Sequence, residues 1–382
     1  MDLAGMNDAA GERPRLLTVN VGSSSVKLVL FAVDDGRPRP LAMAASSQQA
    51  GDLRATLKVL GLDAARDGGL AVVHRIVHGG PRLTATCALD DATESEIDRW
   101  SRRAPLHNRA ALKVAGWVRR FLPHARRYAA FDTAWFADLP DVARRYALPR
   151  ELADLHGLRR YGFHGLAHAS MWRAWQASGR GARLISLQLG AGCSIAAVRA
   201  GRPLDTSMGY STIEGLVMAT RSGDVDPGVV TELARVERLS ARGVEEMLTQ
   251  RSGLLGVSGA SGDMRDLLAA DTPGARDAVA LFCYRARKYV GAYLAVLGGA
   301  DAIAFGGGVG EQAPAIRAGI LAGLDWAGVR LDAAANAAAI GGAHRISAPD
   351  SAVQVWTLPT DEAAQMAFEA IAAGACALRA AP

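Results

Sequence analysis

Apolar runs of strand length recur along the chain, separated by short turn-forming segments. Near the N-terminus, LLTV at 16–19 is followed by a glycine and serine segment and then by LVLF at 28–31. Such a pattern predicts two strands joined by a tight turn. It recurs in weaker form where LISLQL at 184–189 leads through two glycines into IAAV at 195–198.

The two hairpins align position by position. Asn20 of the first corresponds to Gln188 of the second, and an apolar, a turn and an apolar segment recur in the same order. Two copies of one turn predict two related α/β halves that face each other across a cleft. A length of 382 residues agrees, because a chain of this size favours two domains.

The rest of the pattern places a candidate functional residue at the end of a predicted strand. Residues 16–80 read as strand-rich and 92–121 and 226–300 as mainly helical, and the predicted strand RRYAAFDTAWF at 126–136 carries Asp132 toward its C-terminal end. Ligands of open α/β sheets bind at such strand ends. We place the domain boundary near residue 150, which gives a disordered lead-in at 1–14, a first domain at 15–150 plus 364–382, and a second domain at 151–363.

Composition and charge exclude several classes. Half of the residues are hydrophobic, yet no uninterrupted apolar run of about 18 residues occurs, so we expect no membrane partner. The N-terminus lacks the apolar core of a signal peptide, which predicts a cytoplasmic protein. The net charge of +5 comes from basic residues that alternate with acidic ones, so we expect no nucleic-acid partner. The four cysteines show no metal-site or disulfide spacing, and we expect them reduced and buried.

Several polar residues follow the apolar runs and are candidates for a functional site. The turn at 20–27 offers hydroxyls, close backbone approach and Lys27, which is a phosphate cradle in outline, although it is not a Walker A loop. Taken alone, such a turn or any single one of these charged residues is more often structural than functional. Together, arginines and histidines beside glycines suit an anion-binding cleft. The charged candidates are Arg75, His107, Asp132, His164, His168, Arg221 and Asp224.

The motifs, taken in order, resemble the acetate kinase family. They cover about residues 15–370 and are NVGSSSVK, HRIVHGG, PLHN, FDTAW, LRRYGFHGLAH, DTSMGYSTIEGL, TRSGDVDPG, SGLLGVSGASGDMRDL, FGGGVGE and PTDE. The resemblance implies the fold shared with sugar kinases, heat-shock chaperones and actin, in which two similar α/β domains close over ATP. It also implies Mg²⁺, with Mn²⁺ as a substitute, acetate or another short-chain carboxylate as substrate, acetyl phosphate as product, and a homodimer formed through the second domain.

The resemblance assigns roles residue by residue. Arg75 would bind the substrate carboxylate or acyl phosphate, His164 and Arg221 would stabilise the phosphoryl group, and Asp132 would orient magnesium or its water. A short-chain carboxylic acid is ionised at neutral pH, so Asp132 is not needed as a base. Asn20 and Glu362 resemble the magnesium-associated pair. Further substrate-side residues are His107, Val77, Leu106, Phe163 and Thr212. The nucleotide-side residues are Lys27, Gln188, Leu189, Gly190, Ala191, Gly192, Asp263, Met264, Arg265, Gly307, Gly308, Val309, Gly310 and Glu311.

Departures from the family pattern leave alternatives open. Gln188 and Ala191 stand where the family usually has histidine and asparagine, Phe136 replaces a histidine, and Thr212 replaces a proline of the acyl pocket. The sequence therefore predicts an ATP-dependent acetate kinase, with three alternatives. These are a propionate kinase, a weakened kinase that senses nucleotides or acyl phosphates, and a kinase with a donor other than ATP.

Overall fold

The computed structural model describes residues 14–22, 25–65, 67–101, 107–178 and 181–376. These residues form two compact units, one that runs up to Ala134 and resumes at Glu362, and one from Trp135 to Asp361. The sequence analysis placed a boundary near residue 150. The units divide earlier because Phe136 and Leu139 pack in the core of the second unit. The lead-in predicted at 1–14 lies almost wholly outside the described residues.

The first unit holds a mixed sheet in the order β3-β2-β1-β4-β6-β5. Its elements, in chain order, are β1 (Arg15–Val21), β2 (Ser25–Asp34), β3 (Arg37–Ser47), α1 (Ala50–Val59), β4 (Leu70–Ile76), β5 (Cys87–Ala88), α2 (Asp91–Trp100), α3 (Asn108–Phe121), β6 (Arg126–Phe131) and α15 (Glu362–Ala372). The segment 16–80, expected to be strand-rich, therefore also contains helix α1.

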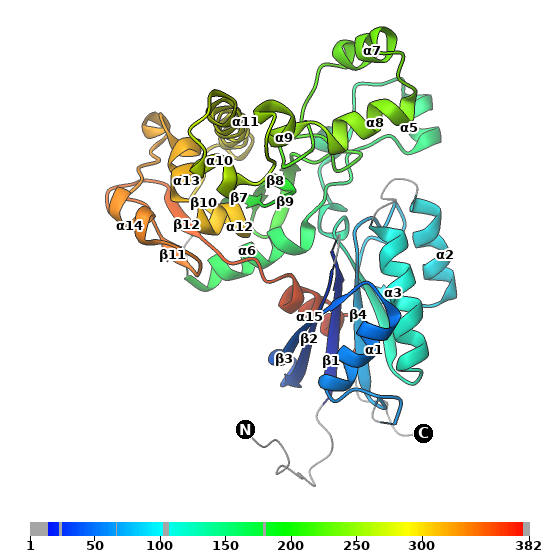
Figure 1. Ribbon diagram of the computed structural model, residues 1–382. Helices are drawn as coiled ribbons and strands as arrows, with labels where there is room; N and C mark the ends of the chain where they lie inside the picture. The colour runs from blue at the N-terminus through cyan, green and yellow to red at the C-terminus, as the bar shows by residue number, and fades with distance from the viewer. Residues whose placement is uncertain (1–13, 23–24, 66, 102–106, 179–180, 377–382) are drawn as a thin grey trace. The chain divides into compact units, whose positions relative to one another are not determined.

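Period-two alternation gives this sheet two buried faces. Leu17 and Val19 of β1 pack with Leu53 of α1 and Val114 of α3 in one core. Helix α15 contacts β1, β3, β4 and β6. Figure 1 shows α1 and α3 beside β1 and β4, with the red α15 next to the same strands. Since successive side chains of a strand point to opposite faces, Asn20 points away from the core that holds Val19.

The second unit repeats the sheet. Read from its β9 edge, its order is β9-β8-β7-β10-β12-β11, which matches the first sheet strand for strand, with the same parallel and antiparallel pairs. Strand β7 begins at Arg183 and β8 at Cys193, with the same spacing between them as between Arg15 of β1 and Ser25 of β2. The prediction of two related α/β halves is confirmed.

The second unit carries more helices than the first. Its elements, in chain order, are a 3-10 turn at Ala134–Phe136, α4 (Asp141–Arg144), α5 (Arg150–His156), α6 (Gly165–Ser178), β7 (Arg183–Leu189), β8 (Cys193–Arg199), β9 (Arg202–Thr206), α7 (Pro227–Val236), α8 (Ala241–Gln250), α9 (Gly253–Ser258), α10 (Met264–Ala269), α11 (Pro273–Leu297), β10 (Ala302–Gly306), α12 (Gly307–Gln312), α13 (Pro314–Leu321), a 3-10 turn at Asp325–Ala327, α14 (Ala333–Ala338), β11 (His344–Arg345) and β12 (Gln354–Thr357).

Helix α6 covers one face of the second sheet. Met171 and Trp175 of α6 pack with Leu184 of β7 and Ala196 of β8 in one core. By alternation, Ser186 of β7 points to the same face as Leu184, and Ser194 of β8 to the same face as Ala196. Helix α11 contacts β7, β8 and β9. Polar residues of the strands are thereby placed under α6.

Two smaller findings complete the fold. All four cysteines are free thiols, but only Cys193 and Cys283 are buried. The expectation of burial was wrong for Cys87, which lies on a two-residue edge strand, and for Cys376, which lies beyond the end of α15. Among the described residues, no helix is both long and apolar enough to span a membrane.

Candidate active site

Four polar residues from distant parts of the chain meet in the first unit. Arg75 binds Asp132 through two parallel bonds, from Nε to Oδ1 at 3.0 Å and from Nη2 to Oδ2 at 2.8 Å. Arg75 Nη1 donates to Glu362 Oε2 at 2.8 Å and to Asn20 Oδ1 at 3.2 Å. Asn20 Nδ2 also donates to Glu362 Oε2 at 2.8 Å. We call Asn20, Arg75, Asp132 and Glu362 the charged cluster.

The strands place these side chains on one face. Asn20 is the penultimate residue of β1, which lies beside β4, the strand that carries Arg75. Glu362 is the first residue of α15, the helix that packs on both strands. Asp132 directly follows β6, and its backbone N–H donates to Ile76 O at 3.0 Å. The cluster therefore forms at strand ends, as the sequence predicted for Asp132.

Burial and ion pairing set the charges. Asp132 is 1 % exposed, and burial raises its pKa to about 6, against the opposing effect of the Arg75 guanidinium. Burial disfavours the charge on Arg75, but Asp132 and Glu362 more than offset this and raise its pKa. With both carboxyl groups ionised, the cluster carries a net charge of −1. The negative charge of the cluster suits a cation.

The oxygen donors of the cluster fit magnesium. Asn20 Oδ1 and Glu362 Oε2 both lie within hydrogen-bond distance of the single nitrogen Nη1 of Arg75, so they are neighbours. Magnesium prefers hard oxygen ligands and is commonly held by one or two protein groups, with water and phosphate completing the shell. The described residues contain no group of three or more His, Cys, Asp or Glu suited to a metal.

The other first-unit candidates lie around these strands. Lys27 is exposed on β2 and pairs with Asn20 across the hairpin, on the same face. Val77 is half-buried just after β4, and His107 is the residue that precedes α3. Leu106 lies outside the described residues, as do Ser23 and Ser24 of the first turn. Gly22 N donates to Ser25 O at 2.8 Å and so closes that turn.

A second set of candidates meets in the second unit. A Cβ built on Gly192 would lie 3.4 Å from His164 Nε2 and 3.5 Å from Arg221 Nη1, so these two side chains flank the glycine. Arg221 Nη1 donates to the backbone oxygen of Thr212 at 3.2 Å. Burial lowers the pKa of Arg221 below its ordinary value. His164 has φ of 58°, a left-handed conformation that is costly for a residue with a Cβ and marks a constrained position. Phe163 beside it is buried.

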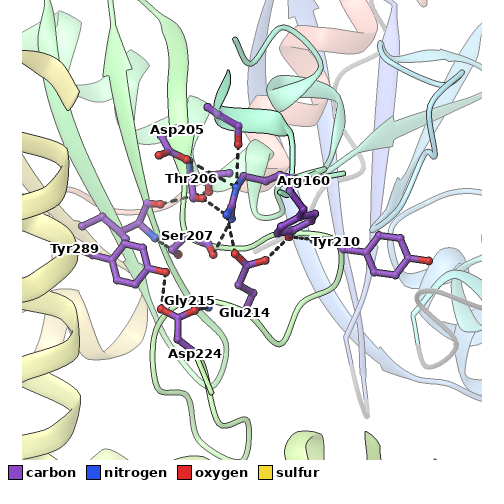
Figure 2. Close-up of polar contacts among 12 residues, drawn as sticks. Arg160, Asp205, Thr206, Ser207, Tyr210, Glu214, Gly215, Asp224 and Tyr289 are labelled. Atoms are coloured by element: carbon purple, nitrogen blue, oxygen red, sulfur yellow. Dashed lines mark hydrogen bonds and ion pairs between the residues drawn. The ribbon is translucent and has the colours of Figure 1, made fainter. Parts of the chain in front are cut away.

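Arg221 lies on a long loop without regular structure, between β9 and α7, and polar contacts hold this loop (Figure 2). Arg160 Nη2 donates to Glu214 Oε1 at 2.6 Å, while its Nη1 donates to Thr206 O at 3.0 Å and to Ser207 O at 3.2 Å. Tyr146 donates its hydroxyl hydrogen to Glu214 Oε2. The residues before Thr212 are thus tied to the body of the unit.

The far side of the loop is tied to helix α11. Tyr289 donates its hydroxyl hydrogen to Asp224 Oδ2 at 2.7 Å, and Asp224 Oδ1 accepts from Gly215 N at 2.8 Å (Figure 2). Asp224 N returns a bond to Gly215 O at 3.0 Å. Asp224, a sequence candidate, therefore acts in holding the loop. Gly215 needs a positive φ of 104°, and a Cβ there would lie 2.7 Å from Ser207 O.

The second hairpin lies next to this loop. Ala191 O accepts from Ala219 N at 3.0 Å, and Gly190 N donates to Gly192 O at 3.1 Å. The Oε1 atom of Gln188 is buried and has no hydrogen-bond partner among the described residues. The Leu189 carbonyl oxygen would lie 2.6 Å from a Cβ on Gly307, whose φ is 74°, so this position of α12 favours glycine.

The remaining nucleotide-side candidates begin helices α10 and α12. Asp263 accepts from Arg265 N at 2.9 Å, and its pKa falls to about 2 through its contacts with Arg265. Met264 begins α10, while Gly308, Val309 and Gly310 lie within α12. Glu311 Oε1 accepts from Gly307 N at 3.0 Å. The structure places these two segments within the second unit.

Comparison with known proteins decides the family. The Acetokinase family model matches residues 38–368. The chain is 46 % identical over 301 residues to the acetate kinase of Solibacter usitatus, covering 76 % of this chain and 73 % of that one. This chain belongs to the acetokinase family.

Solved structures agree with this assignment. The acetate kinase of Porphyromonas gingivalis superposes with a TM-score of 0.86 at 35 % identity, over 94 % of this chain and 99 % of that one. A propionate kinase from Francisella tularensis gives a TM-score of 0.81 at 29 % identity, over 93 % and 98 %. The resemblance stated from the motifs and the fold it implied are confirmed.

Sequence reasoning missed several residues that hold the site. Arg160, Glu214 and Tyr146 support the Arg221 loop, and Ser186 and Ser194 lie under α6. Alternation could have placed Ser186 and Ser194 on one face, because Leu184 and Ala196 define that face. No local pattern joins Arg160 to Glu214, which lie 54 residues apart.

Proposed function

We propose that the protein is an acetate kinase that reversibly transfers the γ-phosphoryl group of ATP to acetate, giving acetyl phosphate and ADP. The observation that carries this proposal is the charged cluster, which family membership alone does not supply. Four residues on separate segments close into one hydrogen-bonded set with oxygen ligands for a cation and an arginine for an anion. Such groups are what phosphoryl transfer to a carboxylate requires.

The reaction needs little proton chemistry. Acetate is ionised at neutral pH, so one of its oxygens attacks the γ-phosphorus in line, and the bond from phosphorus to the β,γ-bridging oxygen breaks to release ADP. We assign Arg221 and His164 to the charge that spreads over the transferred oxygens. Magnesium, when bound by Asn20 and Glu362, would neutralise charge on the donor phosphates.

The bonds of Arg75 define what it can offer a substrate. Its Nε and Nη1 hydrogens are used by Asp132, Glu362 and Asn20, and Nη2 uses one of its two hydrogens on Asp132. We assign the second Nη2 hydrogen to the carboxylate of acetate or to acetyl phosphate. In this proposal Asp132 holds the guanidinium in orientation and also orients magnesium or its water.

A coupled assay in both directions tests the proposal. The wild-type protein should form ATP from acetyl phosphate and ADP with Mg²⁺ or Mn²⁺, and Arg221→Ala should lose turnover while keeping its fold by circular dichroism. Binding of ADP or acetyl phosphate by the wild type without any turnover would instead identify a sensor.

Propionate is the second candidate substrate. The structural similarity to a propionate kinase and the half-buried Thr212 of the acyl pocket favour testing it. One methylene changes selectivity by about 10-fold to 200-fold at most, so both acids should react. The ratio of kcat/KM for acetate and propionate decides, and a tenfold preference for propionate would overturn the acetate assignment.

The phosphoryl donor is a separate question. The turn assigned to the donor phosphates carries the methyl side chain of Ala191 and the Gln188 carbonyl, which has no hydrogen-bond partner among the described residues. We propose ATP as the donor, and a screen of ATP, GTP and pyrophosphate at fixed acetate and magnesium tests it. Greater turnover with another donor would replace ATP in the proposal.

We also propose a cytoplasmic homodimer, on the basis of family resemblance. Sedimentation equilibrium of the purified protein should give twice the mass of 40.0 kDa. A single species at the monomer mass would exclude the dimer, and cell fractionation tests the location.

A further inference from the structure

A buried histidine with no role in the proposed reaction lies behind His164. His168 belongs to α6 and is fully buried, as are Ser186 of β7 and Ser194 of β8. His168 Nδ1 lies 2.8 Å from Ser186 Oγ, and its Nε2 lies 2.8 Å from Ser194 Oγ. Ser194 Oγ lies 2.9 Å from His164 Nδ1. The four side chains form one continuous chain of hydrogen bonds, which we call the hydroxyl-imidazole chain.

His168 is held in one orientation and kept uncharged. The Trp135 ring stacks on it with centroids 6.2 Å apart, and the Phe136 ring meets it edge-on at 6.0 Å. Burial lowers the pKa of His168 to about 3. A neutral imidazole has one N–H donor and one acceptor nitrogen, so one ring nitrogen donates and the other accepts.

Counting hydrogens gives the chain a direction. Within the described residues, Ser186 Oγ has His168 Nδ1 as its sole recorded hydrogen-bond partner. If His168 carried its hydrogen on Nδ1, the Ser186 hydroxyl hydrogen would be buried without an acceptor, which is unfavourable. Ser186 therefore donates to His168 Nδ1, and His168 Nε2–H donates to Ser194 Oγ. Ser194 then has its own hydrogen left to donate to His164 Nδ1.

This direction determines which nitrogen of His164 carries its hydrogen. We propose that His168 is a positioning residue that, through Ser194 and with Ser186 as its anchor, holds His164 as the tautomer protonated on Nε2. That nitrogen faces Gly192, where a Cβ would lie 3.4 Å from it and 3.5 Å from Arg221 Nη1. A phosphoryl oxygen accepts hydrogen bonds, so an Nε2–H attracts it, whereas an Nε2 lone pair would repel it.

The expected effect of the tautomer on catalysis rests on the proposed function. The tautomer of His164 itself can be tested without it. Nitrogen-15 NMR of the histidine side chains of the wild-type protein reads the tautomer directly, with His164→Gln to assign the His164 signals. We expect His164 and His168 each to show a protonated Nε2 and an unprotonated Nδ1 at pH 7.5. A protonated Nδ1 on His164 overturns the proposal without any assay.

Serine variants test whether the chain sets the tautomer. Ser194→Ala removes the hydroxyl that links the two rings, and Ser186→Ala removes the anchor, so both should give mixed tautomers at His164. Ser194→Thr keeps a hydroxyl and should restore the wild-type signals. Ser101→Ala is the matched control, because Ser101 is fully buried in the first unit and its hydroxyl bonds only Ile97 O among the described residues.

Kinetics add the link to phosphoryl transfer. We expect Ser194→Ala to lower kcat about tenfold, equivalent to roughly 1.4 kcal/mol, with KM for acetate changed less than twofold and rescue by Ser194→Thr. An unchanged tautomer and kcat in folded Ser194→Ala would overturn the positioning role. If the wild type shows the expected tautomer but phosphorylates no carboxylate, the proposed function fails and the assignment of the chain stands.

Discussion

The charged cluster and the hydroxyl-imidazole chain lie on two copies of the same sheet. The first is held together by ion pairs and the second by hydrogen bonds between hydroxyl and imidazole groups. In the first unit, Asn20 on β1 is held by an arginine and a carboxyl group, and the arginine binds a second carboxyl group. In the second unit, Gln188 at the matching position of β7 has a buried carbonyl oxygen without a partner among the described residues. Two positions before it, Ser186 begins a chain of hydroxyl and imidazole groups. Duplication has preserved strand order and register, while the side chains diverged.

The two copies differ in the kind of group that they bury, and each kind needs different partners. Ions that are buried need counter-charges, and Arg75 has two carboxyl groups within 3.0 Å. Neutral hydroxyl and imidazole groups need only matched donors and acceptors, and the second copy supplies them without an ion. The first copy therefore suits charged ligands, while the second copy joins hydroxyl and imidazole groups by hydrogen bonds alone.

The largest expected effect breaks the charged cluster. Arg75→Ala leaves Asp132 and Glu362 close together without a counter-charge, which should lower the free energy of unfolding by about 3 to 5 kcal/mol. Urea unfolding measures this loss. Arg75→Lys keeps the charge without the two parallel bonds to Asp132 and should fall between the wild type and Arg75→Ala. An alanine variant as stable as the wild type would show that the cluster is not an ion-pair assembly.

Acid should lower the free energy of unfolding of both units, because each contains a buried histidine with a lowered pKa. Burial lowers the pKa of His74 on β4 and of His168 on α6 to about 3, from 6.5. The unfolded chain therefore binds protons below pH 6.5 that the native protein does not, so stability is complete above pH 6.5 and falls as pH falls toward 3. At pH 5 each histidine should cost about 2 kcal/mol.

Unfolding at pH 7.5 and pH 5 in the wild type and in His74→Leu separates the two contributions. Among the described residues, neither ring nitrogen of His74 has a hydrogen-bond partner, whereas both nitrogens of His168 do. His74→Leu should remove about half of the acid loss without harm at pH 7.5. If the acid loss is the same in His74→Leu, His74 is not the neutral buried group described here.

A smaller effect is expected where the Arg221 loop is anchored. Glu214→Gln weakens the bond to Arg160 and should lower kcat about tenfold and stability by roughly 1 to 2 kcal/mol, since both side chains are partly exposed. Glu232→Gln is the control, because its pair with Arg235 is exposed and should contribute less than about 0.5 kcal/mol. Equal kinetics in the two variants would mean that the anchor does not position Arg221.

The smallest effect compares the matching positions directly. Gln188→Met removes a buried carbonyl oxygen that has no partner among the described residues, so stability should change by less than about 0.5 kcal/mol. Asn20→Leu removes bonds to Glu362 and Arg75 and should cost about 1 to 2 kcal/mol. Thermal unfolding of the two variants under one buffer condition gives the comparison. A costly Gln188→Met would mean that the second copy depends on this amide after all.

The sequence by itself determined the duplicated sheet and the family, because both are local or periodic properties. Alternating apolar runs specify strands, and the alignment of Asn20 with Gln188 and of their flanking runs specifies two copies of one hairpin. The ordered motifs specified the family, which the comparisons confirm. The site residues were named from the same motifs, without their partners.

Only the tertiary structure decided which residues contact one another. Arg75 meets Glu362 across 287 residues, and His164 meets Ser194 across 30, because crossovers and helix packing bring these segments to one sheet face. Burial then set the charges of Asp132 and His168, which no residue pattern reveals. Hydrogen-bond partners and desolvation depend on distant parts of the chain, so they exist only once the two sheets have formed.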